Sequence, residues 1–441
     1  MRADNVHGSE SSLPVAEAAW HALFWLVVAN AIGLLIAGLL LFPAASEMLG
    51  EWTYGRWMIV HLNLELYGWI SLPLVGFLFR AYGADRGAMA KWSRTVLWVW
   101  SAALGVGALS WLAGRSSGKL FLDWSGFARI FFVCALLTLW LFLLAAFIAN
   151  RGTDAWKNRW AAAAKLGGLA VLLAVPFVLY LASSPGVYPP VNPDSGGPTG
   201  ASQLESSLIV VAILLALPFG IARRNTGRTR AVVFAWIALF AESLLCAALG
   251  RGDVSHRQSS QYLSLGSLLV WIPAIPVYYS AFTWHAATHR WRRAFLGWWV
   301  ALVLTGWILF LPGVLDHFKF TDGLVGHSIV AMAGFTSSFI VFVTVQLLGK
   351  DGWIFNRAGS FSFWHGGVVA YVVLMTIAGG IEGSAPAFTI VPSPLRNLLY
   401  ALRLLAGAFM LLASIDWLAG ATKLLREPGA NPMEVRLEKT A

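Results

Sequence analysis

The sequence predicts an all-α integral membrane protein whose helices cross the bilayer twelve times. Hydrophobic residues make up 58% of its 441 residues and charged residues only 12%, and the mean hydropathy is +0.69. Apolar residues in that proportion exceed what the core of a soluble domain can bury. Apolar runs recur along the whole chain, each long enough for a helix to cross about 30 Å of hydrocarbon.

Twelve such runs can be placed along the chain. Prolines and glycines interrupt the fifth, eighth and eleventh, which membrane helices tolerate where neighbouring helices satisfy the backbone. The predicted organisation is a tail at 1–18, a twelve-helix transmembrane domain at 19–420 and a second tail at 421–441. The predicted spans are 20–42, 57–79, 93–113, 129–150, 161–183, 205–222, 231–250, 261–284, 294–313, 323–348, 364–386 and 397–420.

The distribution of lysine and arginine predicts the orientation of these spans. Alternate connecting segments, together with the C-terminal tail, hold most of the basic residues outside the spans, and the opposite segments hold few. Both termini are therefore placed in the cytoplasm. Because the basic loops then face an anionic leaflet, they account for the net charge of +10. The predicted partner is the lipid bilayer, and no nucleic acid is expected.

The two cysteines and the first residues exclude other classes of protein. Cys134 and Cys246 both lie inside apolar runs, so neither a disulfide framework nor a cysteine-type zinc site is expected. The polar N-terminus lacks a short apolar core followed by a cleavage site. It is predicted to be a tail that leads into the first span and not a cleaved signal.

Two histidines lie inside predicted spans at matched depth. His61 follows Arg56 by five residues, and His327 follows Asp322 by five. In the predicted topology both are near the outer face, about 7–8 Å below the membrane boundary. Two imidazoles at one depth on different helices are what a haem or metal between helices requires. Chance gives the same arrangement fairly often in a chain with nine histidines.

The other histidines are expected to have simpler roles. Those near the predicted cytoplasmic boundary or in the first tail are interpreted as polar interface or tail residues. His256 and His317 fall in outer loops, where solvation is the expected state, and an approach to a haem propionate or an exposed metal is the alternative. The boundary and tail histidines are His7, His21, His285, His289 and His365.

Acidic residues inside the spans form a second group of candidates. Glu65 follows His61 by four residues and so shares its helix face, and Glu242 is near the middle of the seventh span. Charged residues at such depth usually face protein or a water-filled path and mark proton or ion routes. A neutral acid hydrogen-bonded to a neighbouring helix is the alternative for each. Asp416 and Arg403 lie inside the last span.

Short sequence windows resemble subunit I of the haem–copper oxidases and nitric-oxide reductases. DGLVGHSIVAMAG is similar to the family's tenth-helix context AHxHLAxxG, with His327 at the first histidine, and HLNLELYGW is similar to the second-helix context HxxLxxxGW, with His61 at its start. GRGDVSHRQSSQYLSLGSLL looks like the segment between the family's helices 7 and 8. The resemblance implies a cytochrome c oxidase subunit I-like bundle, haem binding, respiratory electron transport with cytochrome or other respiratory subunits as partners, and a bacterial cytoplasmic (inner) membrane.

The sequence also departs from the family's pattern. In the family, the second histidine of the tenth-helix pair binds the low-spin haem together with the second-helix histidine, and here that position is Ile329. The family's copper or non-haem iron sits on one histidine of helix 6 and two adjacent histidines of helix 7. Neither corresponding span here contains a histidine, and the adjacent pair would fall near Leu245 and Cys246. We therefore predict haem, with one copy as one possibility, and no copper.

Three functions follow from these patterns. In the first, His327 holds a five-coordinate haem or shares one with His61, and the protein passes electrons, senses a diatomic gas or supports assembly of a respiratory complex without ordinary oxidase turnover. The second is a cofactor-free transporter or channel on the same scaffold, with Glu65, Glu242, Arg403 and Asp416 as polar pathway residues. The third is a structural subunit whose histidines are hydrogen-bonded core residues.

Overall fold

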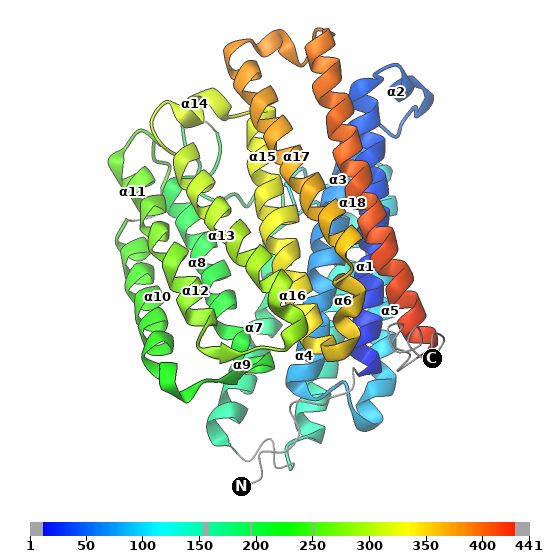
Figure 1. The fold of residues 1–441 in the computed structure, drawn as a ribbon, viewed down its shortest axis with the longest axis vertical. Coiled ribbons are helices and arrows are strands. Elements are labelled where there is room, and N and C mark those ends of the chain that lie inside the picture. Colours follow the sequence, from blue (N-terminus) through cyan, green and yellow to red (C-terminus); the bar gives the residue numbers. More distant parts are fainter. Residues whose placement is uncertain (1–11, 153–157, 195, 250–251, 428–441) are drawn as a thin grey trace, which may run out of the picture. The chain divides into compact units, whose positions relative to one another are not determined.

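The computed structural model describes residues 12–152, 158–194, 196–249 and 252–427. The predicted all-helical fold is confirmed, since helices dominate the described chain (Figure 1). Most of the two predicted tails, 1–11 and 428–441, lies outside the described residues.

Each predicted span corresponds to a helical segment whose ends lie within several residues of the predicted ones. Eleven segments of the described chain are long and apolar enough to cross a membrane. The remaining one, α13, has 21 residues and begins with a basic run. The segments are α1 Leu13–Leu41, α3–η1–α4 Tyr54–Tyr82, α5 Ala90–Leu112, α6 Gly126–Ala149, α7 Arg159–Ala182, α8–α9 Gly200–Ile221, α10 Thr229–Leu249, α11–η5–α12 Ser259–Tyr279, α13 His289–Leu309, α15–η7–α16–η8 Asp322–Phe355, α17 Ala358–Ser384 and α18 Pro394–Arg426.

Short elements connect these helices. The strands β1 and β2 pair antiparallel through two residues each. The short helix α14 lies in the connection between α13 and α15. The short elements are α2 Ala45–Met48, η2 Gly87–Met89, β1 Arg223–Arg224, η4 Thr226–Arg228, β2 Phe282–Thr283, η6 Ala286–Thr288, α14 Val314–Phe318 and η9 Pro386–Phe388.

The chain forms two compact units. Unit 1 comprises 1–187, 343–364 and 407–441, and unit 2 comprises 188–342 and 365–406. In unit 1, α1 packs against α3, η1, α4 and α5; in unit 2, α13 packs against α12, α15 and η7. Each unit therefore has one central helix that contacts a histidine-bearing segment.

Both histidine-bearing segments change from α-helix to π-helix three residues after the histidine. In unit 1, α3 (Tyr54–Asn63) is followed by the π-helix η1 (Leu64–Ile70). In unit 2, α15 (Asp322–Ile329) is followed by the π-helix η7 (Val330–Thr336). A π-turn accommodates one extra residue in an α-helix and is frequent at functional sites.

Candidate functional site

The start of α15 is held by polar side chains of unit 2. The Thr321 hydroxyl caps the helix by accepting from Gly323 N at 3.1 Å. Asp322 N donates to Glu382 Oε2 at 2.8 Å, and Tyr400 donates to Asp322 Oδ2 at 3.2 Å. The first two bonds satisfy backbone donors that a helix start leaves without partners, and the third holds the Asp322 side chain. The turn that leads to His327 is therefore anchored before the histidine is reached.

A buried arginine completes this anchor. Arg403 Nη1 lies 3.5 Å from Asp322 Oδ1, and Arg403 Nε donates to the Tyr371 hydroxyl at 2.6 Å. The arginine is only 5% exposed. A buried guanidinium needs a paired charge, because its desolvation would otherwise be costly. Arg403, which the sequence marked as an intramembrane charge, thus has a structural role as the partner of Asp322.

His327 is oriented by a threonine of α13. His327 Nδ1 lies 3.0 Å from Thr305 Oγ1, and the threonine hydroxyl donates to Ala301 O at 2.7 Å. The threonine hydroxyl has a single proton; with that proton on Ala301 O, Thr305 accepts from His327, and the imidazole carries its proton on Nδ1. The lone pair is then on Nε2. That tautomer is the one a ligand bound through Nε2 requires.

His61 is oriented by a main-chain carbonyl of α1. His61 Nδ1 lies 2.8 Å from Ala29 O. A carbonyl can only accept, so this imidazole also carries its proton on Nδ1 and its lone pair on Nε2. The two histidines therefore have the same tautomer, although a side chain holds one and the backbone holds the other.

A glycine of the central helix faces each imidazole. A Cβ added at Gly33 would lie 3.1 Å from His61 Cε1, and one added at Gly306 would lie 3.4 Å from His327 Cε1. The first distance is tighter than ordinary side-chain packing, and the second is an ordinary contact. Both rings therefore lie directly against a helix backbone, which restricts the orientations that they can adopt.

In each unit, a tryptophan of the central helix packs against a glycine that follows the histidine by seven residues. A Cβ at Gly68 of η1 would lie 2.5 Å from Trp25 Cβ, and one at Gly334 of η7 would lie 2.7 Å from the Trp298 ring. Both tryptophans donate from Nε1 at 3.1 Å, Trp25 to Ser101 and Trp298 to His365. Only glycine permits so close an approach of two helices.

These contacts form an internal repeat that inspection of the sequence does not reveal. In each copy, the glycine that faces the histidine follows the tryptophan by eight residues on the central helix. The glycine under the tryptophan follows the histidine by seven residues, inside a π-helix. We call this set of four residues the histidine module. Its copies are Trp25, Gly33, His61 and Gly68 in unit 1, and Trp298, Gly306, His327 and Gly334 in unit 2.

The two predicted acidic candidates have different surroundings. Glu65 is in η1, half-buried, and it makes no hydrogen bond or ion pair with any residue that the structure describes. Glu242 of α10 is buried; it accepts from Ser267 at 2.6 Å and from the indole of Trp271. Glu242 thus matches the hydrogen-bonded alternative, whereas Glu65 does not. The assignment of either residue to a proton or polar pathway remains a prediction.

Three further positions correspond to haem and copper ligands in the sequence prediction. Ile329 ends α15 and is half-buried, and Leu245 and Cys246 lie in α10. Within the described ranges, no group of three or more His, Cys, Asp or Glu side chains is arranged to hold a metal ion. His61 and His327 belong to different units. A haem shared between them, and the missing copper site, remain predictions.

His256 is buried, contrary to the expected solvation in a loop. Its ring is fully shielded, with Nδ1 3.2 Å from Asp194 Oδ2 and Nε2 3.4 Å from Asp316 Oδ1. Its backbone N donates to Asn192 Oδ1 at 3.3 Å. The sequence separations are too large for loop composition to reveal this cluster, which we call the loop clasp: Asp194, His256 and Asp316.

The two clasp carboxyls have lowered pKa values. The hydrogen bond from Ser255 lowers the pKa of Asp194, and the charges of His256 and Arg257 act in the same direction. Burial raises the pKa of Asp316, but Lys319 and His256 outweigh that effect, so its pKa lies below the ordinary value. Both carboxylates are therefore charged at neutral pH.

Comparison with known proteins identifies the fold. No protein-family model matches the chain, and no curated protein matches it. Among solved structures it is similar to a haem–copper terminal oxidase dimer determined by cryo-electron microscopy, with a TM-score of 0.60 and 13% sequence identity. The match covers 95% of this chain and 85% of that one. The chain thus has the fold of a haem–copper terminal oxidase chain, as the resemblance predicted.

Proposed function

We propose that the chain is a membrane-embedded haem protein in which His327 and His61 supply imidazole ligands and the oxidase copper site is missing. The hydrogen bond between His327 and Thr305 is the observation that carries this proposal, because a threonine that donates to Ala301 O accepts from Nδ1 and leaves the imidazole lone pair on Nε2. Imidazole is the common protein ligand of haem iron.

The surroundings of both histidines fit such a role. A ligating histidine almost always donates its other ring N–H to a carbonyl, a carboxylate or water, which sets the tautomer and raises its basicity. Ala29 O does this for His61, and the Thr305 hydroxyl, polarised by its own bond to Ala301, does it for His327. When bound, haem would supply one-electron redox chemistry, and these residues would orient the ligands.

The missing copper ligands limit the reactions that the proposed haem protein could catalyse. Neither α8 nor α10 contains a histidine, and Ile329 stands where the family has its second tenth-helix ligand. Without a second metal, reduction of dioxygen to water lacks the bimetallic centre that cleaves the O–O bond. We therefore propose electron transfer or a supporting role in a respiratory complex of a bacterial inner membrane, with cytochrome or other respiratory subunits as partners. Ordinary oxidase turnover is not expected.

Optical spectra of the purified protein test this proposal. Oxidised and dithionite-reduced spectra with a pyridine haemochrome count should show a Soret band in the wild type. His327→Ala should abolish or reduce bound haem, and His61→Ala should do so or change the ligation. His289→Ala is the matched control, since His289 is exposed at the start of α13. A full wild-type spectrum in both module variants, or a colourless wild type from a haem-replete host, would remove the proposal.

A cofactor-free transporter is the second candidate, and one observation favours it. Glu65 is an intramembrane carboxyl with no polar partner among the described residues, as in a residue that exchanges protons with water or a substrate. On this reading, Glu65→Gln should impair substrate-dependent stabilisation or proton-coupled uptake in liposomes, whereas His327→Ala should matter less. The reverse order would exclude the transporter. A structural subunit, the remaining alternative, predicts that neither substitution changes a measured activity.

A further inference from the structure

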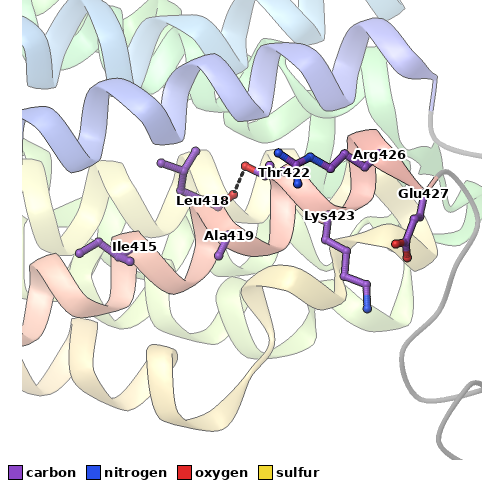
Figure 2. A pocket seen from close by; sticks show the side chains of 7 residues that line it. All are labelled: Ile415, Leu418, Ala419, Thr422, Lys423, Arg426 and Glu427. Atoms are coloured by element: carbon purple, nitrogen blue, oxygen red, sulfur yellow. Dashed lines mark hydrogen bonds between the residues drawn. The ribbon is translucent and has the colours of Figure 1, made fainter.

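A groove runs along the last turns of α18 in unit 1. Its volume is about 480 Å³, and its lining comes from α18 and from Glu427, the residue that follows the helix (Figure 2). Ile415, Leu418 and Ala419 line one end, and Lys423, Arg426 and Glu427 line the other. The groove is thus apolar at one end and charged at the other.

The length of α18 places these two ends at different depths. The helix has 33 residues, which at 1.5 Å per residue is about 50 Å, whereas the hydrocarbon core is about 30 Å thick. Its last turn therefore extends into the headgroup layer. Ile415 precedes Lys423 by eight residues, or about 12 Å along the axis, so the apolar end lies at the level of the lipid acyl chains.

A tryptophan supports this depth. Trp20 Nε1 donates to Thr422 Oγ1 at 2.9 Å and so ties α1 to α18 beside the groove. Tryptophan is enriched where the hydrocarbon meets the headgroups, because its ring is apolar and its N–H needs a partner. Thr422 lines the groove next to Lys423. The charged end is thus at the level of lipid phosphates.

The two cations are available to a ligand. Lys423 and Arg426 are exposed, and within the described residues neither makes an ion pair or a hydrogen bond through its side chain. Cations in the last turn of a helix also interact favourably with its dipole, but that interaction leaves their N–H donors for another acceptor. Glu427 at the rim reduces the net positive charge and disfavours a second phosphate.

We propose that this groove binds one anionic glycerophospholipid, with its phosphate on Lys423 and Arg426 and an acyl chain along Ile415, Leu418 and Ala419. Basic pockets at the ends of transmembrane helices recognise lipid headgroups in this way. Charge complementarity selects the anionic headgroup, and the apolar end selects a lipid over free phosphate. The site is independent of the histidine modules and of any bound haem.

Lipid titration of the detergent-purified full chain tests the site. Phosphatidylglycerol should bind in native mass spectrometry and raise the thermal midpoint more than phosphatidylcholine with the same acyl chains. K423Q/R426Q should lose this preference about thirtyfold, the factor that corresponds to two lost phosphate contacts of about 1 kcal/mol each. The matched control is R223Q/R224Q, which removes two exposed cations of unit 2.

A second variant tests the apolar end without a change of charge. Ala419 is exposed, so Ala419→Trp should fill the groove, leave the helix folded and reduce binding of both lipids. Equal loss of preference in R223Q/R224Q and K423Q/R426Q would overturn the proposal, as would displacement of the lipid by inorganic phosphate. A thermal midpoint that phosphatidylglycerol does not change, but E434Q/E438Q lowers, would show that the chain's own C-terminal acids occupy the groove.

Discussion

The two histidine modules share one design and differ in what holds the imidazole. In unit 1 the partner is the Ala29 carbonyl, and in unit 2 it is the Thr305 hydroxyl. A backbone carbonyl stays in place when its residue is replaced, whereas a hydroxyl is lost with a single substitution. The backbone of α1 therefore sets the orientation of His61, whereas the orientation of His327 depends on the single side chain of Thr305.

The largest difference is expected at the glycine under each tryptophan. A Cβ at Gly68 would meet Trp25 Cβ, which cannot move without its backbone, whereas a Cβ at Gly334 would meet a ring that can rotate. Gly68→Ala should therefore lower the free energy of unfolding by about 3 kcal/mol and Gly334→Ala by about 1 kcal/mol. Thermal unfolding measures both. Gly105→Ala is the control, with nothing within 4 Å; equal stability of all three variants would contradict the packing argument.

Loss of the Thr305 hydroxyl should affect only the module in unit 2. Thr305→Val keeps the shape but removes the acceptor for His327 Nδ1, and loss of such an outer partner typically weakens a ligand site 10–100-fold. If His327 binds haem as proposed, we expect about tenfold faster loss of that haem and a shift in its midpoint potential, with Thr305→Ser restoring both. Thr138→Val removes a hydroxyl that likewise donates to its own helix and should change neither. Haem with an unchanged potential in Thr305→Val would leave Thr305 a packing residue only.

A smaller contrast is expected at the glycine that faces each imidazole. The added methyl group of Gly33→Ala would lie 3.1 Å from His61 Cε1, whereas that of Gly306→Ala would lie 3.4 Å from His327 Cε1. Displacing a ring from its rotamer costs about 0.5–1.5 kcal/mol. If both histidines bind haem as proposed, the optical band that depends on His61 should therefore shift in Gly33→Ala, while the band that depends on His327 stays in place in Gly306→Ala. The opposite pattern would show that the rings are not held as described.

The smallest effect is expected in the connections, where the units respond to pH in opposite directions. Burial raises the pKa of Asp123 in unit 1, so its stabilising contribution grows as pH falls. The lowered pKa values of Asp194 and Asp316 give unit 2 a contribution that is present above about pH 4 and lost as pH falls further. Hydrogen exchange, corrected for intrinsic rates, should show residues 188–194 open below pH 4. D194N/D316N should remove this transition, and an unchanged transition in that variant would exclude the clasp.

Most of the fold was predictable from hydropathy, and the site only in part. Apolar run lengths predicted all twelve helical segments because the bilayer thickness imposes them. The position of His327 in the second turn of its helix followed from Asp322, which begins α15. Thr305 could not be predicted, because it precedes His327 by 22 residues on another helix and threonine is common in membrane helices. Pairing across helices is set by packing, which a single sequence does not record.

The histidine module escaped detection for a related reason. Its two copies share only four residues of three types, spread over two helical segments in each unit, and the π-helices shift the phase of the pattern midway. His256 was predicted to be solvated because its neighbours in sequence are polar. Its actual neighbours, Asp194 and Asp316, come from two other connections. Charge and polarity along a loop thus predict exposure poorly where three loops meet.

The π-helices after His61 and His327 make these two segments sensitive to the deletion of a single residue. One additional residue in a turn rotates everything that follows by about 100° relative to a regular α-helix. Each segment therefore consists of two helical parts of different phase. The first part carries the imidazole, and the second carries the glycine that packs against the tryptophan. Deleting a single residue from η1 or η7 would give one regular α-helix and rotate the imidazole away from its central helix. Composition and length would remain almost unchanged.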